Sequence, residues 1–570
     1  MIDSVEAPVW QQVRGWRPRF GTTRTLIRVA AIVIAVAIIA PIVSVGLSVF
    51  FPSGEIGAHL AATVLPRYIV NTLWLFLGVG VTSALLGVGG AWLTAICRFP
   101  GRGFFNWALI LPLALPSYIL AYVYYDFLAA SGPLQRTIRD LTGLSAGDYW
   151  FPRISSLEGA VFILTLALYP YVYLIVRAYL SDQSPRIVEA ARSLGCNLFE
   201  ASWRVMLPLA RPAIVVGVTL VLMETLADFG AVSLLGVQTF TTGIYRAYFS
   251  MSAPIAAAQL ATVLLGFVFI LVIIERASRR RARFDATDRP GFHGQKIRLY
   301  GGQIALANIL CAIPVVLGFV LPVILLIDLA IGAHSQGLGA RSLTALTNSV
   351  FVGFIAAACA AALALLMVFH TRLSPGRRAV GVNRVAQMGY AIPGTVIAIG
   401  TLIPLAAMDR ALSAWFDQVL GVDVGLVLIG TVGALVYAYL VRFMAVSIGS
   451  VESGFARIAN SLDDAASTLG VGPVGRLWRI HIPMVWRSLG VAFVLVFVDV
   501  IKELPATLVL RPFNFETLAV EVFNLARDER IAEAALPALI LIAVGLIPVA
   551  IMSHGITRLG GSKRSGGVLR

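Results

Sequence analysis

Twelve apolar segments run along this chain, and each is long enough to cross a bilayer as a helix, which takes about 20 residues. In the first half they lie at 29–50, 69–97, 105–128, 157–180, 212–235 and 254–274. In the second half they lie at 304–331, 346–369, 385–407, 425–444, 489–510 and 534–551. The segments are continuously apolar rather than alternating, which favours helices over a barrel. The sequence therefore predicts an all-α integral membrane protein with about twelve transmembrane helices.

The composition excludes a soluble globule of this length, because 58% of the residues are hydrophobic and only 13% are charged. The formal net charge of +15 could suggest nucleic-acid binding. The basic residues gather in alternate loops, however, which is the pattern that membrane topology produces. We therefore expect a lipid bilayer around the chain, no nucleic-acid partner, and both termini on the cytoplasmic side.

A short segment occurs twice, as Glu-Ala-Ala-Arg-Ser-Leu-Gly at 189–195 and as Asp-Ala-Ala-Ser-Thr-Leu-Gly at 464–470. We call the constant difference in numbering between the two copies the repeat offset. Further residues match at the repeat offset: Trp203 with Trp478, Arg204 with Arg479, Pro208 with Pro483, Glu224 with Asp499, Asp228 with Glu503, and Thr242 with Thr517. A duplicated membrane half explains these matches. We predict two homologous six-helix halves related by a pseudo-twofold axis along the membrane normal.

The predicted boundaries follow from the apolar segments and the repeat. A cytoplasmic tail occupies 1–28, and a first membrane domain occupies 29–275, with its repeated loop at about 181–211. A cytoplasmic linker at 276–300 joins it to a second membrane domain at 301–555, whose repeated loop lies at about 447–488. A cytoplasmic tail at 556–570 ends the chain.

Each repeated loop is expected to hold one short helix that ends at a glycine, Gly195 or Gly470, where a positive φ is easy. In the second loop Ser461 is a candidate helix cap. The paired alanines make one side of each helix small, so that the helix could enter a groove of another protein. The alternative is a connecting helix without a partner, and the recurrence of the whole pattern favours the docking helix.

These two loops resemble the signature of a known family, the membrane permease subunits of ATP-binding-cassette importers, and the chain resembles the fused form with two such domains. In that family the loop helix docks into a cleft on a cytoplasmic ATPase and couples ATP use to the membrane path. The resemblance implies coupling contacts at Glu189, Ala190, Ala191 and Gly195, and at Asp464, Ala465, Ala466 and Gly470. Asp464 departs from the family pattern, which has Glu there, and keeps the charge on a shorter side chain.

The resemblance also implies partners: two copies of the ATPase, an external or periplasmic substrate-binding protein, and a location in a bacterial inner (plasma) membrane. The chain has no phosphate-binding Gly-x-x-x-x-Gly-Lys-Ser/Thr loop, so ATP and Mg would be used by the partner ATPase and no cofactor is expected in this chain. The histidines are scattered without zinc spacing, so we expect a transport subunit and no enzyme, with no catalytic residues. His481, in the second loop, is expected to be an exposed surface residue.

Acidic residues inside apolar segments are costly and usually face a cavity or a partner, which makes Glu224, Asp228, Asp499 and Glu503, with Lys502, candidates for a translocation pathway or gate. Ferric iron prefers oxygen ligands of this kind. The alternative is structural: Lys502 could pair with Asp499 or Glu503, and an acid could cap a helix broken at Pro505. No metal ligand can be assigned from these residues.

The segments that follow the two loops look most like those of ferric-iron permeases, so the resemblance implies import of ferric iron by alternating access. Permeases for thiamine, phosphonate, polyamine or sulfate remain an alternative within the family. A secondary transporter with duplicated halves, driven by an ion gradient through the same acids, is the alternative from another class. The paired docking helix favours the ATP-driven importer.

Overall fold

The computed structural model describes residues 21–145, 147–182, 185–281, 296–332, 339–422 and 425–561. Most of the predicted N-terminal tail and linker, and the end of the C-terminal tail at 562–570, lie outside this set. The chain divides into two compact units. Unit 1 comprises Met1–Ile39, Ala357–Tyr390 and Phe443–Val496, and unit 2 comprises Ala40–Ala356, Ala391–Arg442 and Phe497–Arg570.

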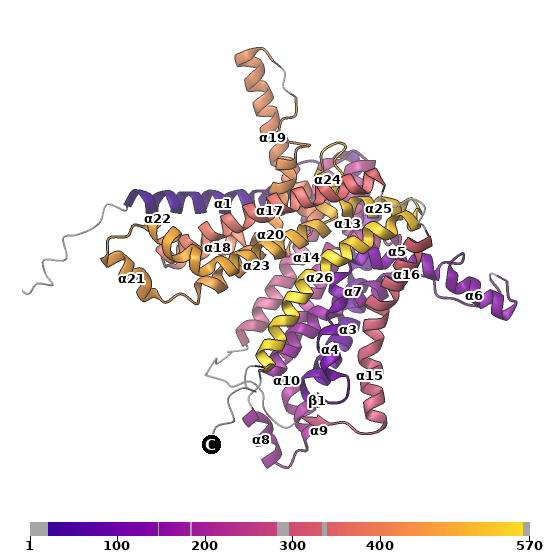
Figure 1. Ribbon diagram of the computed structural model, residues 1–570. Coiled ribbons are helices and arrows are strands. Elements are labelled where there is room, and N and C mark those ends of the chain that lie inside the picture. The colour runs from indigo at the N-terminus through magenta and orange to yellow at the C-terminus, as the bar shows by residue number, and fades with distance from the viewer. Residues whose placement is uncertain are drawn as a thin grey trace, which may run out of the picture. The chain divides into compact units, whose positions relative to one another are not determined.

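Among its described residues, the first half of the chain forms helices and one short strand (Figure 1). Its elements are α1 (Gly21–Leu47), η2 (Ser48–Phe50), α2 (Gly54–His59), η3 (Leu60–Val64), α3 (Leu65–Ile96), β1 (Cys97–Arg98), α4 (Arg102–Ala108), η4 (Leu111–Ala114), α5 (Ser117–Leu128), α6 (Pro133–Thr142), α7 (Leu157–Ser181), α8 (Pro185–Ser193), α9 (Leu198–Ala201), η5 (Ser202–Met206), α10 (Leu207–Leu209), α11 (Arg211–Ala227), α12 (Gly230–Leu234), α13 (Phe240–Tyr245), η6 (Arg246–Ser250) and α14 (Pro254–Arg281).

The second half repeats this character. Its elements are β2 (Ile297–Arg298), α15 (Gly302–Val315), η7 (Val316–Val320), α16 (Leu321–Gly332), α17 (Ala340–Leu373), α18 (Arg377–Ala386), η8 (Met388–Ala391), α19 (Gly394–Leu420), α20 (Val432–Phe455), α21 (Asn460–Thr468), α22 (Pro473–Arg476), η9 (Leu477–His481), α23 (Ile482–Lys502), α24 (Pro505–Leu510), α25 (Leu518–Arg527) and α26 (Ile531–Gly561). The predicted all-α class is confirmed.

Ten helices among the described residues are long and apolar enough to cross a membrane, and two bent helix pairs raise the number to twelve. These twelve correspond one for one to the twelve predicted segments. One bent pair joins Arg102–Ala114 to Ser117–Thr142 at 89°, and the other joins Phe199–Leu209 to Arg211–Ala227 at 59°. The chain is therefore a multi-pass membrane protein with ten to twelve spans.

The structure corrects three of the predicted segments, for which apolar length alone predicts unbroken helices. The segment at 105–128 bends before α5, where the backbone of Leu115 is extended in front of Pro116. The segments at 212–235 and 489–510 both stop early, at Ala227 and Lys502, and resume as the short helices α12 and α24. An acid stands at each of these two breaks, Asp228 and Glu503, and apolar periodicity alone does not reveal it.

Some outer boundaries also differ from the predicted ones. Helix α1 begins at Gly21, inside the predicted N-terminal tail, and α14 runs to Arg281, inside the predicted linker. The linker ends with β2, which pairs in parallel with β1 so that Arg98 lies beside Arg298. Helix α26 continues to Gly561, inside the predicted C-terminal tail.

The duplication is visible in the bounds of the elements. Helices α7 and α20 begin one repeat offset apart, and both ends of α8 and α21 are related in the same way, as are those of the π-helical turns η5 and η9. Earlier in each half the offset is slightly larger, and it is the same for η4 and η8 as for the first residues of α5 and α19. These elements thus follow one another in the same order in both halves.

Within unit 2, the central packing is formed by α3 and α7, which run along each other and both contact α11 (Figure 1). Their close approach depends on Gly87, because a Cβ at that position would lie 2.6 Å from the Cβ of Val172. Helix α26 packs against α16 and α25. The buried core of this unit includes the fully enclosed rings of Tyr169 and Tyr173.

Unit 1 contains the end of α17, all of α18, the end of α20, and the second repeated loop. Ser447 on α20 donates a hydrogen bond of 3.0 Å to the Ala360 carbonyl on α17. Asn383 on α18 donates one of 3.2 Å to Glu452 on α20. These contacts hold together the helices that carry α21.

Candidate functional site

Both repeated loop helices end in the same hydrogen-bonded motif. In the first loop the Cys196 N–H bonds to the Ala191 carbonyl at 3.1 Å and the Gly195 N–H to the Arg192 carbonyl at 2.9 Å. In the second, the Val471 N–H bonds to Ala466 at 2.9 Å and the Gly470 N–H to Ser467 at 3.1 Å. This pair of bonds is the Schellman motif, which needs a left-handed residue.

Glycine supplies that left-handed residue in both loops, with φ of 90° at Gly195 and 77° at Gly470. The predicted helix ends are therefore confirmed. The predicted start of the second helix is wrong, because α21 begins at Asn460 after Ala459, and no side chain caps it. Ser461 lies inside the helix instead.

The two helices present equivalent outward faces. Glu189 and Ala190 are exposed on α8, as Asp464 and Ala465 are on α21. The second alanine of each pair, Ala191 or Ala466, is buried against its own protein. Of the predicted contact residues, the acid and the first alanine are thus available to a partner, while the second alanine lets the helix pack closely on its own unit.

Each outward face also carries a leucine directly before the glycine. Leu194 is 85% exposed and Leu469 is 81% exposed. These leucines are equivalent in the repeat, and Trp203 and Trp478 are exposed at equivalent places in η5 and η9. A large apolar side chain that is almost fully exposed at two equivalent positions indicates a contact site.

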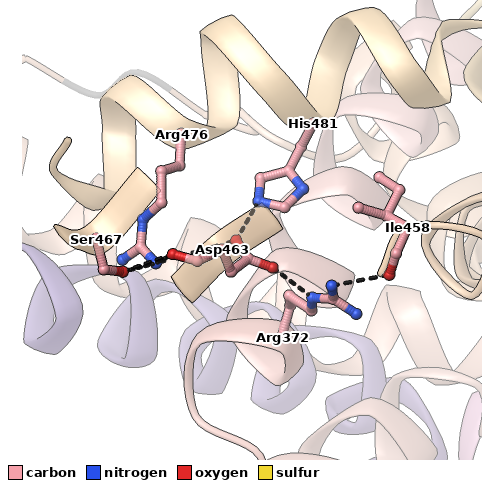
Figure 2. Close-up of polar contacts among 6 residues, drawn as sticks. All are labelled: Arg372, Ile458, Asp463, Ser467, Arg476 and His481. Carbon is pink, nitrogen blue, oxygen red and sulfur yellow. Dashed lines mark hydrogen bonds and ion pairs between the residues drawn. The ribbon is translucent and has the colours of Figure 1, made fainter. Parts of the chain in front are cut away.

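Asp463 anchors the second loop helix to its surroundings, as Figure 2 shows. Its Oδ2 accepts a hydrogen bond of 2.8 Å from Arg372 Nε at the end of α17. Its Oδ1 lies 2.9 Å from His481 Nε2 in η9. Arg372 also donates to the Ile458 carbonyl at 2.9 Å. One carboxylate thus joins α21 to the end of α17 and to the turn η9.

Arg476 adds a second attachment from α22. Its Nη1 donates to Ser467 Oγ at 3.0 Å and lies 3.9 Å from Asp463 Oδ1 (Figure 2). Only 6% of its side chain is exposed. We call the group formed by Asp463, Arg372, Arg476 and His481 the Asp463 network.

The prediction that His481 is an exposed surface residue is wrong. Its side chain is fully buried, stacked on Phe455 with ring centroids 5.2 Å apart and tilted against Phe369 at 5.5 Å. Asp463 is the acceptor that makes burial of the imidazole tolerable. The prediction fails because it treats His481 only as a loop residue, and the acid that pairs with it stands earlier in the chain, on α21.

The first loop has a different attachment. At the positions of Asp463, Arg476 and His481 it has Val188, Ala201 and Met206. Ala201 and Met206 are buried, and Trp92 on α3 contacts the loop through an edge-to-face pair with Phe199 and a 3.3 Å bond to Ser202. Apolar packing therefore takes the place of the Asp463 network.

Two of the predicted pathway acids cap short helices. Asp228 accepts hydrogen bonds from the Ala231 and Val232 N–H groups, at 3.0 and 3.1 Å, and from Ser117. Glu503 accepts them from the Ala506 and Thr507 N–H groups, at 3.1 and 3.2 Å. The equivalent acids of the two halves thus perform the same task at the start of α12 and α24.

The charged partners differ from those considered in the sequence. Arg442 on α20 lies 3.5 Å from Glu503 Oε1, and Glu503 is buried. Lys502 donates a 3.4 Å bond to the Leu113 carbonyl. Of the two pairings considered for Lys502, Asp499 is the one in electrostatic range. The capping alternative is therefore favoured for Asp228 and Glu503.

Glu224 and Asp499 lie elsewhere, in the last turns of α11 and α23. They occupy equivalent positions of the two halves, and the structure brings them within electrostatic range of each other and of Arg442. Lys502 is also within range of Asp499. These four residues, which we call the central charge cluster, join both halves at one place.

Within the part of the chain that the structure describes, no three His, Cys, Asp or Glu side chains gather as a metal site. The central charge cluster holds two carboxylates and two cations. Charges of both signs at one place can attract or repel an ion without holding it in a fixed coordination shell.

The structure shifts one of the matches between the halves. Thr517 stands at the N-cap position of α25, and the residue at the N-cap position of α13 is Thr239 rather than Thr242. Asn71 on α3 donates 2.8 Å to the Gln238 carbonyl, and Asn348 on α17 donates 3.0 Å to the Glu516 carbonyl, which fixes the same correspondence. The second half therefore carries a short insertion in the loop after α24, which a match at the constant repeat offset does not include.

Sequence reasoning missed Leu194, Leu469 and the Asp463 network. The leucines lie within the repeated segment and could have been found, because both copies read Leu-Gly at the end of the helix. The Asp463 network has no counterpart in the first copy, so the repeat itself contains no signal for it.

Comparison with known proteins agrees with this architecture. The family model described as "Binding-protein-dependent transport system inner membrane component" matches residues 87–284. The chain is 26% identical to the Fe(3+)-transport system permease protein FbpB 2 of Haemophilus influenzae, over 88% of this chain and 94% of that protein. It is 21% identical to the ferric transport system permease protein FbpB of Actinobacillus pleuropneumoniae, over 89% of this chain and 74% of that protein.

A shorter relative matches only one part of the chain. The molybdenum transport system permease protein ModB of Escherichia coli is 28% identical over 35% of this chain and 89% of its own length. This shorter protein thus corresponds to one part of the chain, whereas the ferric relatives extend across both halves.

Proposed function

Because a transport-permease family model matches residues 87–284 and permeases named for ferric transport align over most of the chain, we propose that this chain is the membrane subunit of an ATP-driven importer for ferric iron. Two copies of a cytoplasmic ATPase would use ATP and Mg, and an external binding protein would deliver the cargo. The observation that carries the iron assignment is the extent of the relatives: two permeases named for ferric transport align over 88% and 89% of this chain.

Coupling to the ATPase is assigned to the outward faces of α8 and α21. On this proposal Glu189, Ala190 and Leu194, and equally Asp464, Ala465 and Leu469, enter clefts of the two ATPase copies. Ala191, Ala466, Gly195 and Gly470 hold each helix in place from behind. The support is the equivalent exposure of the two faces, together with the identical Schellman ends.

The transport step is alternating access. Closure of the two ATPases on ATP moves both loop helices, the membrane path opens to the outside, and the binding protein releases iron into it. Hydrolysis of ATP resets the path. The central charge cluster of Glu224, Asp499, Lys502 and Arg442 is proposed to line this path, because both halves contribute to it. Asp228 and Glu503 stabilise the helix breaks that precede α12 and α24.

The proposed topology retains the predicted boundaries. Two permease domains at about 29–275 and 301–555 place their repeated loops, both termini and the linker in the cytoplasm. The basic residues of these segments support this orientation. The membrane would be the inner membrane of a bacterial cell.

Uptake of radiolabelled ferric iron by cells that lack or regain the chain tests the substrate, with labelled molybdate and thiamine measured in parallel. We expect iron uptake alone to return with the intact chain. Restored molybdate or thiamine uptake with unchanged iron uptake would overturn the iron assignment and leave the permease class. If uptake continues after the proton gradient is collapsed, that result would contradict the secondary transporter.

A further inference from the structure

A pocket of about 390 Å³ lies in unit 2 between α16, α25 and α26, close to the start of α17. Helix α16 ends and α26 begins at this pocket, and both belong to candidate membrane spans. The pocket therefore lies at the level of span ends, where lipid headgroups meet water. Its volume is within the range of small-ligand sites.

One oxygen of a buried carboxylate in the pocket lacks a hydrogen-bond partner. Glu521 on α25 is only 2% exposed. Its Oε1 accepts a hydrogen bond of 2.6 Å from Ser342 Oγ, while its Oε2 has no hydrogen-bond partner. Burial raises the pKa of this carboxyl, and the Ser342 bond and the nearby Arg341 charge lower it. A buried carboxylate oxygen without a partner is costly, and a bound group with N–H donors and a positive charge would remove the cost.

Two arginines stand at the rim of the same pocket. Arg341 donates from Nε and Nη2 to Glu516, at 2.8 and 3.0 Å. Arg530 donates from Nε to Glu533 at 2.8 Å and also from Nη2. Each arginine uses one edge of its guanidinium group in this way, so the N–H groups of Nη1 are left for a further acceptor. An anionic group could thus bind to these arginines in the same pocket as Glu521.

The remaining wall is apolar. Ile327 and Ile331 lie one turn apart on α16, and Leu536 and Leu539 line the pocket from α26. Both helices belong to candidate membrane spans. The pocket thus combines a buried carboxylate, two arginines that are paired with Glu516 and Glu533, and an apolar wall.

We infer that this pocket binds a phospholipid whose headgroup carries a primary ammonium group, such as a phosphatidylethanolamine. The ammonium group donates to Glu521 Oε2, the phosphate accepts from Arg341 and Arg530, and the acyl chains lie along the apolar wall. The inference concerns a lipid site and does not depend on the identity of the transported substrate.

Native mass spectrometry of the full chain, purified in mild detergent, tests the site with three lipids of identical acyl chains. Phosphatidylethanolamine has ammonium N–H donors, phosphatidylcholine has a cation without N–H, and phosphatidylglycerol has neither. We expect phosphatidylethanolamine to bind about tenfold tighter than the other two, as the loss of a charge-assisted hydrogen bond implies. Equal binding of all three would overturn the inference without any variant.

The variant Glu521→Gln keeps the shape of the side chain and removes its charge. It should weaken phosphatidylethanolamine binding about tenfold. Asp528→Asn, an equivalent charge change at an exposed position outside the pocket, should leave binding unchanged. Unaltered binding in Glu521→Gln would refute the assignment of the ammonium group. Binding of free phosphoethanolamine as tight as that of the lipid would show a site for soluble amines, and would also refute it.

Discussion

The two repeated loops share a backbone and differ in what holds it. Helices α8 and α21 have the same length, the same Schellman end and the same exposed leucine. The second is fixed by the Asp463 network, and the first by apolar residues and by Trp92. The shared features are those that a docking partner would meet, and the differing ones face the protein's own interior.

The two halves differ in the same way in the loops that precede α13 and α25. The carbonyl that anchors Asn71 belongs to the neutral Gln238, while the one that anchors Asn348 belongs to Glu516, which pairs with Arg341 and Arg511. The second half thus uses ion pairs where the first uses neutral groups. Charged networks specify one geometry strongly, but they fail severely when one member is removed.

The largest effect is expected from Asp463→Ala. It leaves the fully buried His481 without its acceptor and the nearly buried Arg476 without its ion-pair partner, at a cost of about 2–3 kcal/mol to the local stability of the second loop. Hydrogen exchange of the α21 amides would measure this cost directly. The control Asp464→Ala removes the adjacent exposed acid and should leave the exchange of α21 unchanged. Equal exchange in both variants would remove the contrast between the loops.

Truncation of the exposed leucines should act on the partner and not on the fold. Leu194→Ala and Leu469→Ala should each change stability by less than about 0.5 kcal/mol, because the side chains touch little of the chain itself. Each should weaken binding of the ATPase by about 2 kcal/mol if the leucine is buried on docking. Affinity measured by titration of the ATPase onto the reconstituted chain checks this, and an undiminished affinity in both variants would contradict the docking face.

Substitution of the helix-ending glycines should affect the two loops to different extents, and this difference should be smaller than those above. Gly195→Ala and Gly470→Ala each strain a left-handed residue by about 1 kcal/mol, although nothing crowds either position. The Asp463 network should keep α21 in place despite this strain, whereas α8 has no such anchor. Iron uptake should therefore fall more in Gly195→Ala, and an equal loss in the two variants would contradict the difference in anchoring.

Acid pH should produce the smallest difference between the two halves. The hydrogen bond from Arg341 holds the pKa of Glu516 below its usual range. A lowered folded-state pKa stabilises the protein above the unfolded value and loses that stabilisation as the pH falls through the folded one. Because the pair is partly exposed, the contribution is about 0.5 kcal/mol. Hydrogen exchange at the start of α25 should rise below about pH 4.5.

The start of α13, beside the neutral Gln238, should not change over the same pH range. Glu516→Gln serves as the control, since it should make the exchange at α25 independent of pH in this window. A parallel rise at both helices in the unaltered protein would mean that acid acts on the whole fold and not on this ion pair.

Much of the fold could be predicted because it depends on features that sequence displays directly. Apolar length located all twelve segments, and the two repeated glycines marked helix ends because left-handed backbone favours that residue. The break at Asp228 escaped because an acid that caps a helix within an apolar run does not alter the mean polarity of the run, and the break at Glu503 was considered only as the alternative of a helix broken at Pro505. The continuous helices expected there were therefore wrong.

The candidate site was predictable in its repeated part only. The Asp463 network joins Asp463 to Arg372, which stands far earlier in the chain, and such a contact has no local pattern. Likewise, Glu224 and Asp499 were recognised as acids in apolar helices, but their approach to each other depends on how α11 and α23 pack. The short insertion before Thr517 also needed the structure, because the anchors from Asn71 and Asn348 revealed it.

Both loop helices are proposed to couple the chain to its ATPase, and co-purification of the two proteins measures this coupling. Leu194→Glu and Leu469→Glu, combined in one chain, place a charge on each docking face without touching the interior. We predict a folded, monodisperse chain that no longer retains its ATPase and no longer imports iron, while the unaltered chain does both. An ATPase that stays bound to the double variant and still drives uptake would contradict the account.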